Sequence, residues 1–274
     1  MRQVQRSVFK EACSHWRLKH ARKRIVCLRR VALAENARRN MKSETVLEAR
    51  NVSFSYKGKD VLQNVNIVLR NGSIVGLTGP NGIGKTTLLS LFIGDLIPGS
   101  GSVTINGKNP ASISDRSKLF GVYLPGYGFT QTDKVGSALS DLCTLFDADS
   151  SYVGSLLKRF GVDEFLNMRI DKLSEGMRKK FELVAASMTD APVLILDEPT
   201  NGLDVQSVEL LRKFVKEKKR QGVLVIISLH VMSELDLIAD SLIGVCDGKA
   251  RMLESFSPGV AGSAQSCYKS MFNE

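Results

Sequence analysis

The pattern of apolar and polar residues along the 274-residue chain predicts strands of two kinds. Apolar and polar positions alternate over residues 46–55 and 61–69, which is typical of an antiparallel sheet with one exposed face. Residues 73–78, 193–196 and 223–228 are instead mostly apolar, as strands are in a parallel sheet that is covered on both faces. Shorter strands are predicted at 102–106, 118–124 and 241–246.

Helices are predicted between these strands. Apolar residues recur at helical spacing within residues 126–172, which indicates a helical insertion. Further helices are expected at 175–189, 205–220 and 231–239. Because strands and helices alternate, the predicted fold is α/β: a core with a parallel sheet, an antiparallel β subdomain and a helical subdomain.

The predicted boundaries divide the chain into three parts. Residues 41–254 would form the α/β domain, with the helical subdomain at about 126–190. Residues 1–40 would be a basic N-terminal extension. The tail at 255–274 is rich in glycine and serine and is expected to be poorly ordered.

Positive charge is concentrated at the N-terminus. Residues 1–40 hold 12 of the 38 basic residues but two of the 28 acidic ones, so the other 234 residues carry 26 of each. Since this remainder is neutral, no nucleic-acid partner is expected from the charge. Three interpretations of residues 1–40 stay open: an extension upstream of a natural start at Met41, a basic amphipathic helix on anionic lipid, and an organelle-targeting segment.

The sequence predicts no membrane-spanning segment of its own. Its longest apolar runs fall well short of about 18 residues, and the charged N-terminus lacks the apolar stretch of a secretory signal. The five cysteines are odd in number and show no metal-binding or redox spacing, which favours a reducing compartment. A function at a membrane would therefore require a separate membrane protein.

Residues 79–87 carry the chemistry around which the chain is organised. They match G-x-x-x-x-G-K-[ST] between a predicted strand and an apolar helix, which is the setting of a phosphate-binding loop. Glycines let the backbone wrap around an anion, and the helix adds the positive end of its dipole. Lys85 would reach the outer phosphates as part of the catalytic set, and the Thr86 hydroxyl would bind Mg²⁺. The predicted nucleotide-binding residues of the loop are Gly79, Pro80, Asn81, Gly82, Ile83, Gly84, Lys85, Thr86 and Thr87.

Two of the predicted apolar strands lead into residues with catalytic potential. Asp197 and Glu198 follow the strand at 193–196, and His230 follows the apolar run at 223–229. The carboxyl ends of parallel strands meet at one edge of the sheet, where Mg²⁺ and the γ-phosphate of a nucleotide would lie. Asp197 is therefore expected to bind Mg²⁺, Glu198 to activate water as a general base, and His230 to contact the γ-phosphate.

The order of these motifs resembles that of the ATP-binding-cassette (ABC) ATPases. The phosphate loop, LSEGM at 173–177, LILDEPT at 194–200 and His230 follow one another within residues 44–250. In that family two cassettes close head to tail, so each ATP lies between the phosphate loop of one and the signature segment of the other. The resemblance implies further nucleotide-binding residues: Ser174, Gly176 and Asp204 at this contact, and Tyr56 stacked on adenine.

Two departures from the family pattern bear on activity. The signature is LSEGM where LSGGQ is usual, so Glu175 and Met177 replace a glycine and a glutamine. Gly126 stands where the family usually has a glutamine that touches Mg²⁺ and the attacking water. Gln131 lies nearby and would replace that glutamine only if the loop were rearranged.

These features predict the ATP-binding and ATP-hydrolysing subunit of an ABC transporter, with ATP and Mg²⁺ as cofactors. The single cassette resembles small export-type ATPases, which act as homodimers, or as heterodimers with a second cassette. They are peripheral proteins at the cytoplasmic face of the membrane, bound to a separately encoded permease. Two alternatives remain: a soluble ABC protein that acts on ribosomes or nucleic acid, and a regulatory cassette that hydrolyses ATP poorly because of Gly126.

Overall fold

The computed structural model describes residues 46–124, 129 and 132–271. The chain divides into two units, Met1–Glu44 and Thr45–Glu274. The first unit lies outside the described residues, and so does the predicted basic extension of residues 1–40. Every described helix and strand belongs to the second unit.

An antiparallel sheet of three strands contains the alternating segments. β1 (Val46–Tyr56), β2 (Lys59–Arg70) and β4 (Ser100–Ile105) lie in the order β2-β1-β4 and pair antiparallel. Towards the end of β2 alternate residues are buried, namely Val65, Ile67 and Leu69. This burial confirms the antiparallel sheet with one covered face that the alternation predicts.

A second sheet of six strands contains the mostly apolar segments. Its order is β5-β6-β7-β3-β8-β9, in which the first five strands are parallel and β9 is antiparallel to β8. The strands are β3 (Ile74–Thr78), β5 (Phe120–Tyr123), β6 (Val193–Asp197), β7 (Leu224–Ser228), β8 (Ser241–Cys246) and β9 (Lys249–Met252). Every residue of β3, β6 and β7 is buried, which confirms the predicted parallel core.

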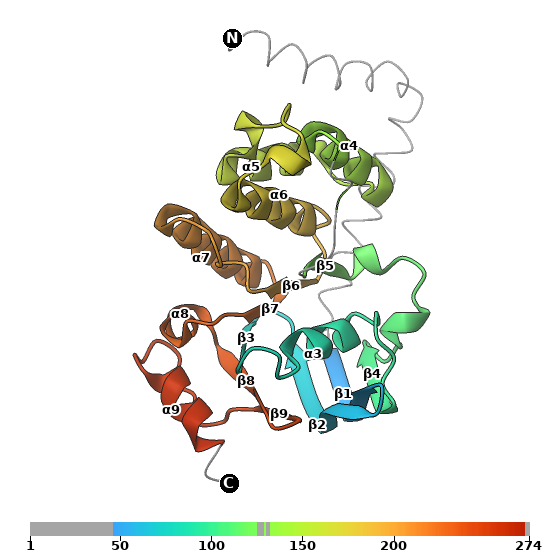
Figure 1. Ribbon diagram of the computed structural model, residues 1–274, viewed down its shortest axis with the longest axis vertical. Coiled ribbons are helices and arrows are strands. Elements are labelled where there is room, and N and C mark those ends of the chain that lie inside the picture. Colours follow the sequence, from blue (N-terminus) through green and yellow to red (C-terminus); the bar gives the residue numbers. More distant parts are fainter. Residues whose placement is uncertain (1–45, 125–128, 130–131, 272–274) are drawn as a thin grey trace. The chain divides into compact units, whose positions relative to one another are not determined.

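Each face of the six-stranded sheet packs against a different set of elements. Val193 and Ile195 of β6 belong to one hydrophobic cluster with α3 (Lys85–Phe92) and the three-stranded sheet. Leu194 and Leu196 belong to the other cluster, with α6 (Glu175–Ser187), α7 (Val205–Arg220) and α8 (Met232–Ile238). Since consecutive strand residues point to opposite faces, an uninterrupted apolar run supplies both clusters. Figure 1 shows α3 beside β1, β2 and β4, and α6 and α7 on the other side of β6 and β7.

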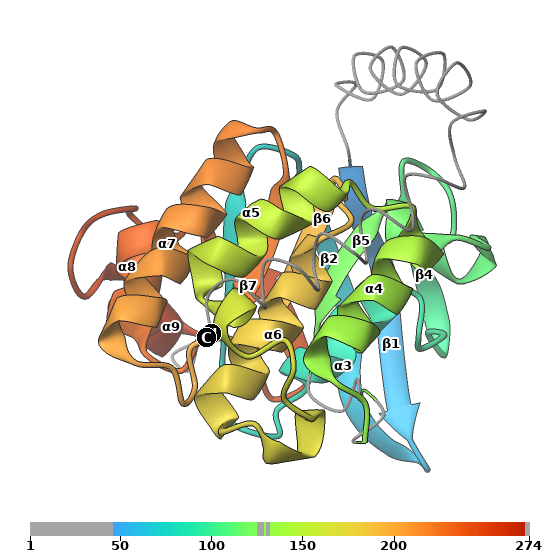
Figure 2. The same cartoon turned by 90° about the horizontal axis from the view of Figure 1, so that it is seen from above.

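The helical insertion is present as two helices. α4 (Val135–Phe146) and α5 (Ser150–Phe160) group with α6 (Figures 1 and 2). Asp149 caps α5, because its carboxylate accepts a hydrogen bond of 2.8 Å from Ser151 N–H. Short 3₁₀ turns lie at Pro110–Ser112, Arg116–Lys118, Val162–Glu164 and Ile170–Lys172.

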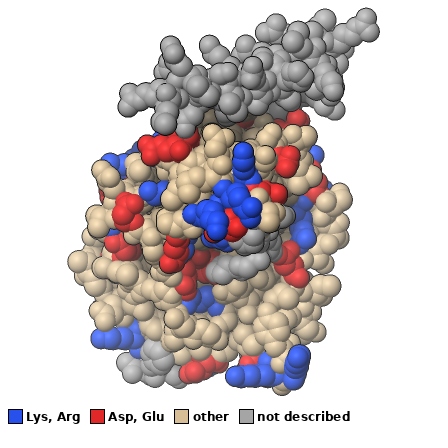
Figure 3. All heavy atoms as spheres, turned by 45° about the horizontal axis from the view of Figure 1, so that its top comes forward, with Lys and Arg blue, Asp and Glu red and all other residues tan. Residues whose placement is uncertain are grey.

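Charged side chains of both signs are interspersed on the face drawn in Figure 3. This distribution matches the equal numbers of acidic and basic residues in the chain beyond residue 40. The described residues contain no helix that is long and apolar enough to cross a membrane.

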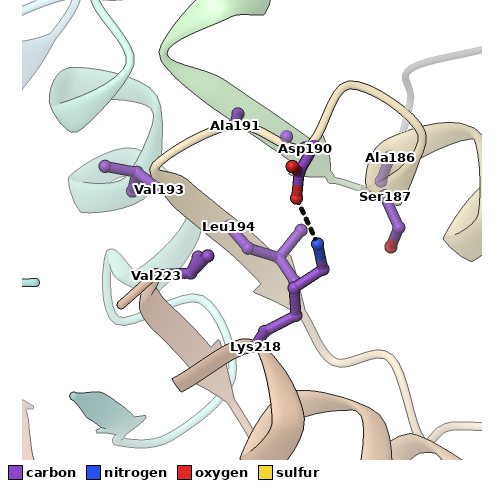
Figure 4. Close-up of a pocket in the computed structure, with 9 residues that line it drawn as sticks. Ala186, Ser187, Asp190, Ala191, Val193, Leu194, Lys218 and Val223 are labelled. Atoms are coloured by element: carbon purple, nitrogen blue, oxygen red, sulfur yellow. Dashed lines mark hydrogen bonds and ion pairs between the residues drawn. The ribbon is translucent and has the colours of Figure 1, made fainter. Parts of the chain in front are cut away.

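Lys218 of α7 contacts both α5 and the segment before β6, at the edge where the parallel strands begin. Its buried Nζ lies 2.7 Å from Oδ1 of Asp190 (Figure 4) and 4.8 Å from the centre of the Tyr152 ring. Burial alone would lower the pKa of Lys218, but Tyr152 and Asp190 raise it. The pocket around the pair is about the size of one water molecule. It lies at the amino ends of β5, β6 and β7 and therefore at the edge opposite Asp197.

The described part of the tail, residues 255–271, contains a helix packed on the core, so the prediction of a poorly ordered tail was wrong for these residues. Ser263–Ser270 form α9, in which Ala264, Cys267 and Tyr268 are buried. The Tyr268 hydroxyl donates a hydrogen bond of 3.0 Å to the carbonyl oxygen of Val245 in β8, and burial raises the pKa of Tyr268 to about 12. The tail is ordered because few but well-placed side chains contact the core, a feature that composition does not reveal.

Asp236 of α8 holds the start of α9. This buried carboxylate accepts hydrogen bonds from the backbone N–H groups of Gly262 and Ala264, each at 2.8 Å. The carbonyl oxygen of Asp236 also accepts from Gly259 N–H at 2.9 Å. One residue of α8 therefore satisfies three backbone donors of the C-terminal segment.

Asp236→Ala is expected to lower the free energy of unfolding by about 3 kcal/mol, because two backbone N–H groups lose a charged acceptor. The midpoint of thermal unfolding should fall by roughly 6–12 °C, and hydrogen exchange should accelerate over residues 259–271. Glu254→Ala removes an exposed acid near the segment and serves as the control. Equal unfolding midpoints for the two variants would show that the carboxylate does not hold the segment.

Candidate active site

The loop between β3 and α3 has a backbone that requires glycine at two positions. Gly79 has φ 152°, and a Cβ there would lie 2.6 Å from the carbonyl oxygen of Val245. Gly84 has φ 118° and precedes α3, and a Cβ there would lie 2.9 Å from Cγ1 of Val61. Side chains at these positions would fill the space into which the loop is wound.

Lys85 is folded back over the loop. Its Nζ donates hydrogen bonds to the carbonyl oxygens of Gly79 at 2.8 Å and Pro80 at 3.1 Å, and its side chain is only 5% exposed. No side chain caps the amino end of α3 within the described residues, and its first turn contains no acid. The loop thus combines a fixed ammonium group with backbone N–H groups at a positive helix end, which suits an anion.

Thr86 and Asp197 meet at the carboxyl edge of the six-stranded sheet. Thr86 Oγ1 donates a hydrogen bond of 2.5 Å to Asp197 Oδ2, although the two residues are 111 positions apart in the chain. Asp197 is 2% exposed and ends β6. A hydroxyl and a carboxylate oxygen beside a phosphate-binding loop form a donor set that fits Mg²⁺, which prefers oxygen ligands and phosphate partners.

Glu198 has a left-handed backbone conformation, with φ 54°, which is uncommon for a residue with a side chain. Its Oε1 lies 3.7 Å from Lys85 Nζ, and its Oε2 lies 2.8 Å from His230 Nε2. Its side chain is 26% exposed, so water can reach it. The structure therefore brings Lys85, Glu198 and His230 together, at the edge where the sequence predicts them.

Two residues near Glu198 were not predicted from the sequence. Asn201 Nδ2 donates to Glu198 Oε2 at 2.9 Å, and Ser228 of β7 contacts both Asp197 and the backbone of Glu198. The available signal for Ser228 was its place as the first polar residue at the end of an apolar strand. Asn201 lies in a turn and carried no comparable signal.

The remaining predicted site residues make no polar contact with the loop. Within the described part of the chain, Tyr56, Ser174, Gly176 and Asp204 make no hydrogen bond or ion pair with residues 79–87. Ser174 caps α6 by accepting a hydrogen bond of 3.3 Å from Met177 N–H.

Asp204 caps α7 in the same way. Its Oδ1 accepts a hydrogen bond of 2.7 Å from Ser207 N–H, and Oδ2 lies 3.3 Å from Lys180 Nζ. The hydrogen bonds from Ser207, followed by that from Lys180, lower the pKa of Asp204 to about 2. Asp204 is exposed and is therefore charged at neutral pH.

The unusual signature residues have defined positions. Glu175 Oε1 pairs with Lys179 Nζ at 3.0 Å, one helical turn further on. Met177 is partly buried against the larger helical cluster, which gives a packing reason for an apolar residue there. Gly126 and Gln131 lie outside the described residues.

Arg212 joins the helix that follows Asp204 to the helix that follows His230. Its Nε and Nη2 donate to the two carboxylate oxygens of Glu234 at 2.7 and 2.5 Å. Its Nη1 donates to Glu209 at 3.0 Å. The hydrogen bond with Glu234 is the main cause that raises the pKa of Arg212. A planar, bidentate pair of this kind fixes the spacing of α7 and α8.

Arg212→Ala is expected to lower the free energy of unfolding by about 1 kcal/mol, since the pair is partly exposed and screened by solvent. The thermal midpoint should fall by roughly 2–4 °C. In a double-mutant cycle with Glu234→Ala, the two losses should be less than additive. Strictly additive losses would show that the two side chains do not interact.

The loop, Thr86, Asp197 and the α/β sheet define the class of protein: a phosphate-loop nucleoside-triphosphatase. The ABC transporter family model matches residues 62–201. The chain is 31% identical over 194 residues to the ABC transporter ATP-binding protein NatA of Bacillus subtilis (strain 168), spanning 69% of this chain and 79% of NatA. It belongs to the ABC transporter family, and it is an ATP hydrolase coupled to transport.

Two further comparisons agree with this assignment. The zinc uptake system ATP-binding protein ZurA of Listeria innocua serovar 6a is 32% identical over 185 residues, or 64% of this chain and 72% of ZurA. A solved structure of the ATP-binding subunit of an ABC transporter superposes with a TM-score of 0.74 at 25% identity. The match covers 83% of this chain and 100% of that structure. These comparisons confirm the predicted fold class and family.

Proposed function

We propose that this protein hydrolyses ATP to power export through a separately encoded membrane permease. The observation that supports the proposal most directly is the convergence of Lys85, Thr86, Asp197, Glu198 and His230 at one sheet edge. Lys85 and Thr86 begin the helix after β3, Asp197 ends β6 with Glu198 next to it, and His230 lies two residues after β7. Such a constellation suits binding and cleavage of a triphosphate.

The phosphates would be held by residues 79–87, with Lys85 on the outer phosphates and the amino end of α3 facing their negative charge. Thr86 and Asp197 would hold Mg²⁺. Bound there, the ion would neutralise charge on the β- and γ-phosphates. The side chain of Tyr56 is 49% exposed at the end of β1 and stands edge-on to Phe54, with ring centres 4.8 Å apart. An exposed aromatic ring held in this way is suited to stack on adenine.

Glu198 would act as the general base. A water molecule beside its carboxylate would lose a proton to it while attacking the γ-phosphorus, and the bond from that phosphorus to the ADP oxygen would break. His230 contacts Glu198 and would also contact the γ-phosphate. Lys85 lies 3.7 Å from Glu198, so its ammonium group would stand beside both the general base and the outer phosphates.

A second copy would complete the site. Ser174 and Gly176 lie at the start of α6, and Asp204 at the start of α7. Ser174 and Asp204 are exposed, and within the described residues none of the three makes a hydrogen bond or ion pair with the loop of its own chain. In a head-to-tail homodimer, they would face the ATP held by the partner's loop. A heterodimer with a different cassette would use the same surfaces, and the size of the purified ATP-bound complex would distinguish the two.

The protein would be peripheral to the cytoplasmic face of the membrane, without a nucleic-acid partner. The neutral charge of the chain beyond residue 40 supports the second statement. Export, rather than uptake, rests on the single cassette with a short helical insertion. ZurA is described as part of an uptake system, so membership of the family alone does not set the direction of transport.

The proposal is tested by purifying tagged Glu198→Gln protein from detergent-solubilised native membranes in Mg-ATP, followed by mass spectrometry. A stoichiometric multi-span protein is expected, and Lys85→Ala protein should recover less of it. The permease so identified would be reconstituted in vesicles, and its direction of transport measured with ATP on the cassette side. Recovery of ribosomal proteins or RNA without a membrane protein would overturn the transporter assignment.

A further inference from the structure

Ser228 lies at the centre of the candidate active site but outside the phosphate loop and the strand-end acids. It is the last residue of β7 and is completely buried. β7 lies between β6, which ends in Asp197, and β3, which leads into the loop. In the parallel pairing of β6 and β7, Ser228 is directly opposite Asp197.

The Ser228 hydroxyl makes two hydrogen bonds with different partners. Its Oγ donates to Asp197 Oδ1 and accepts from the backbone N–H of Glu198 at 2.8 Å. The same N–H is 3.2 Å from the carbonyl oxygen of Ser228. One hydroxyl therefore contacts both consecutive acids.

The hydrogen bond from Ser228 determines which carboxylate oxygen of Asp197 is available to Thr86. Because Oδ1 is occupied by Ser228, the carboxylate presents Oδ2 to Thr86, 2.5 Å away. A rigid second contact of this kind fixes the orientation of a ligand carboxylate.

The bond to Glu198 holds a backbone conformation that is otherwise unfavourable. With φ 54°, Glu198 turns out of the strand direction, and this turn aims its carboxylate at His230 and Lys85. Non-glycine residues persist in this region only where surrounding contacts impose it. The hydrogen bond from Glu198 N–H to Ser228 Oγ is one such contact.

We propose that Ser228 is a positioning residue that sets Asp197 for the metal ion and Glu198 for the attacking water. This inference rests on the proposed roles of these two acids in Mg-ATP hydrolysis. Ser228 itself would contact neither ATP nor the metal ion. Its single hydroxyl would couple the metal ligand to the general base.

Three substitutions isolate the hydroxyl. Ser228→Ala removes it without adding volume. Ser228→Thr and Ser228→Val add the same bulk at a buried strand position, where both residues are well tolerated, but only threonine keeps the hydroxyl. Ser187→Ala is the control, because Ser187 is also a buried serine, at the end of α6, and its Oγ has no partner within the described residues.

The first measurement is the affinity for Mn²⁺, a paramagnetic substitute for Mg²⁺, in the presence of ATP, by electron paramagnetic resonance. Ser228→Ala and Ser228→Val should bind Mn²⁺ about tenfold to a hundredfold more weakly than wild type. Ser228→Thr and Ser187→Ala should stay close to wild type. The affinity for a fluorescent ATP analogue in EDTA should be unchanged in all four variants, because the loop is intact.

The second measurement is turnover at saturating Mg²⁺. Loss of the hydroxyl should lower kcat by about tenfold or more, with KM for ATP little changed, and threonine should restore kcat. A merely structural role would instead lower the unfolding midpoint of both Ala and Val variants without a selective loss of metal affinity.

The inference is overturned if Ser228→Ala binds Mn²⁺ as tightly as wild type, or if threonine and valine behave alike while both remain folded. Failure of the proposed function would look different: wild-type protein would show no divalent-ion binding that depends on ATP. That result would overturn the assigned roles of Asp197 and Glu198 and the role of Ser228 with them.

Discussion

Glu198→Gln protein is expected to bind ATP with the affinity of wild type but to hydrolyse it about 10²- to 10⁴-fold more slowly. The amide has nearly the shape of the carboxylate and can still accept a hydrogen bond from Asn201, so the local structure should persist. It cannot accept a proton from water at neutral pH. Steady-state phosphate release and binding of a fluorescent ATP analogue measure the two quantities separately.

The same variant should accumulate as an ATP-bound dimer, detectable by light scattering during size-exclusion chromatography, because hydrolysis would no longer reopen it. Glu254→Gln makes the same chemical change at an exposed glutamate outside the site and should behave as wild type. If Glu198→Gln retained wild-type turnover, another group would activate the water. Asp197, as the neighbouring acid, would be the first to examine.

Lys85→Ala protein is expected to bind ATP roughly 100-fold or more weakly than wild type. Each hydrogen bond from the ammonium group to a charged phosphate contributes about 1.5–3 kcal/mol, and tenfold in affinity corresponds to about 1.4 kcal/mol. Two such bonds account for the expected loss. Equilibrium binding of a fluorescent ATP analogue measures it directly, with and without Mg²⁺.

Lys213→Ala is the matched control, since this lysine is 65% exposed on α7 and pairs loosely with Glu209 at 3.6 Å. It should leave ATP affinity unchanged. Circular dichroism should confirm that Lys85→Ala protein is folded, because the buried ammonium group also contacts two carbonyl oxygens of the loop. A folded Lys85→Ala protein with wild-type affinity would rule out the phosphate-loop assignment.

Glu175 places a negative charge at the start of α6, where the proposed dimer would bring the partner's ATP. The ion pair with Lys179 at 3.0 Å partly offsets that charge. Lys179 also donates to the carbonyl oxygen of Asn201, whose side chain contacts Glu198. Glu175, which stands where the family usually has glycine, is thus paired with Lys179, and Lys179 also connects α6 to the loop after β6.

The sequence by itself determined the parts of this protein that depend on contiguous residues. The phosphate loop follows from nine adjacent positions whose backbone demands are local, as the contacts at Gly79 and Gly84 illustrate. The parallel core follows from unbroken apolar runs, because a strand covered on both faces has no exposed side on which to place polar residues. Because the carboxyl ends of parallel strands meet at one edge of a sheet, the edge at which Asp197 and His230 lie could also be predicted.

Only the tertiary structure decided the features that depend on the register between distant segments. Ser228 is positioned by its pairing with a strand 31 residues earlier, and no local pattern states which residue stands opposite Asp197. The start of the C-terminal helix α9 is bound by one buried carboxylate, Asp236, in a different helix. The left-handed turn at Glu198 arises in the same way, since its backbone N–H is held by the neighbouring strand. Local preference fixes which segments become strands and loops, whereas the geometry between them is fixed by packing and by hydrogen bonds across the sheet.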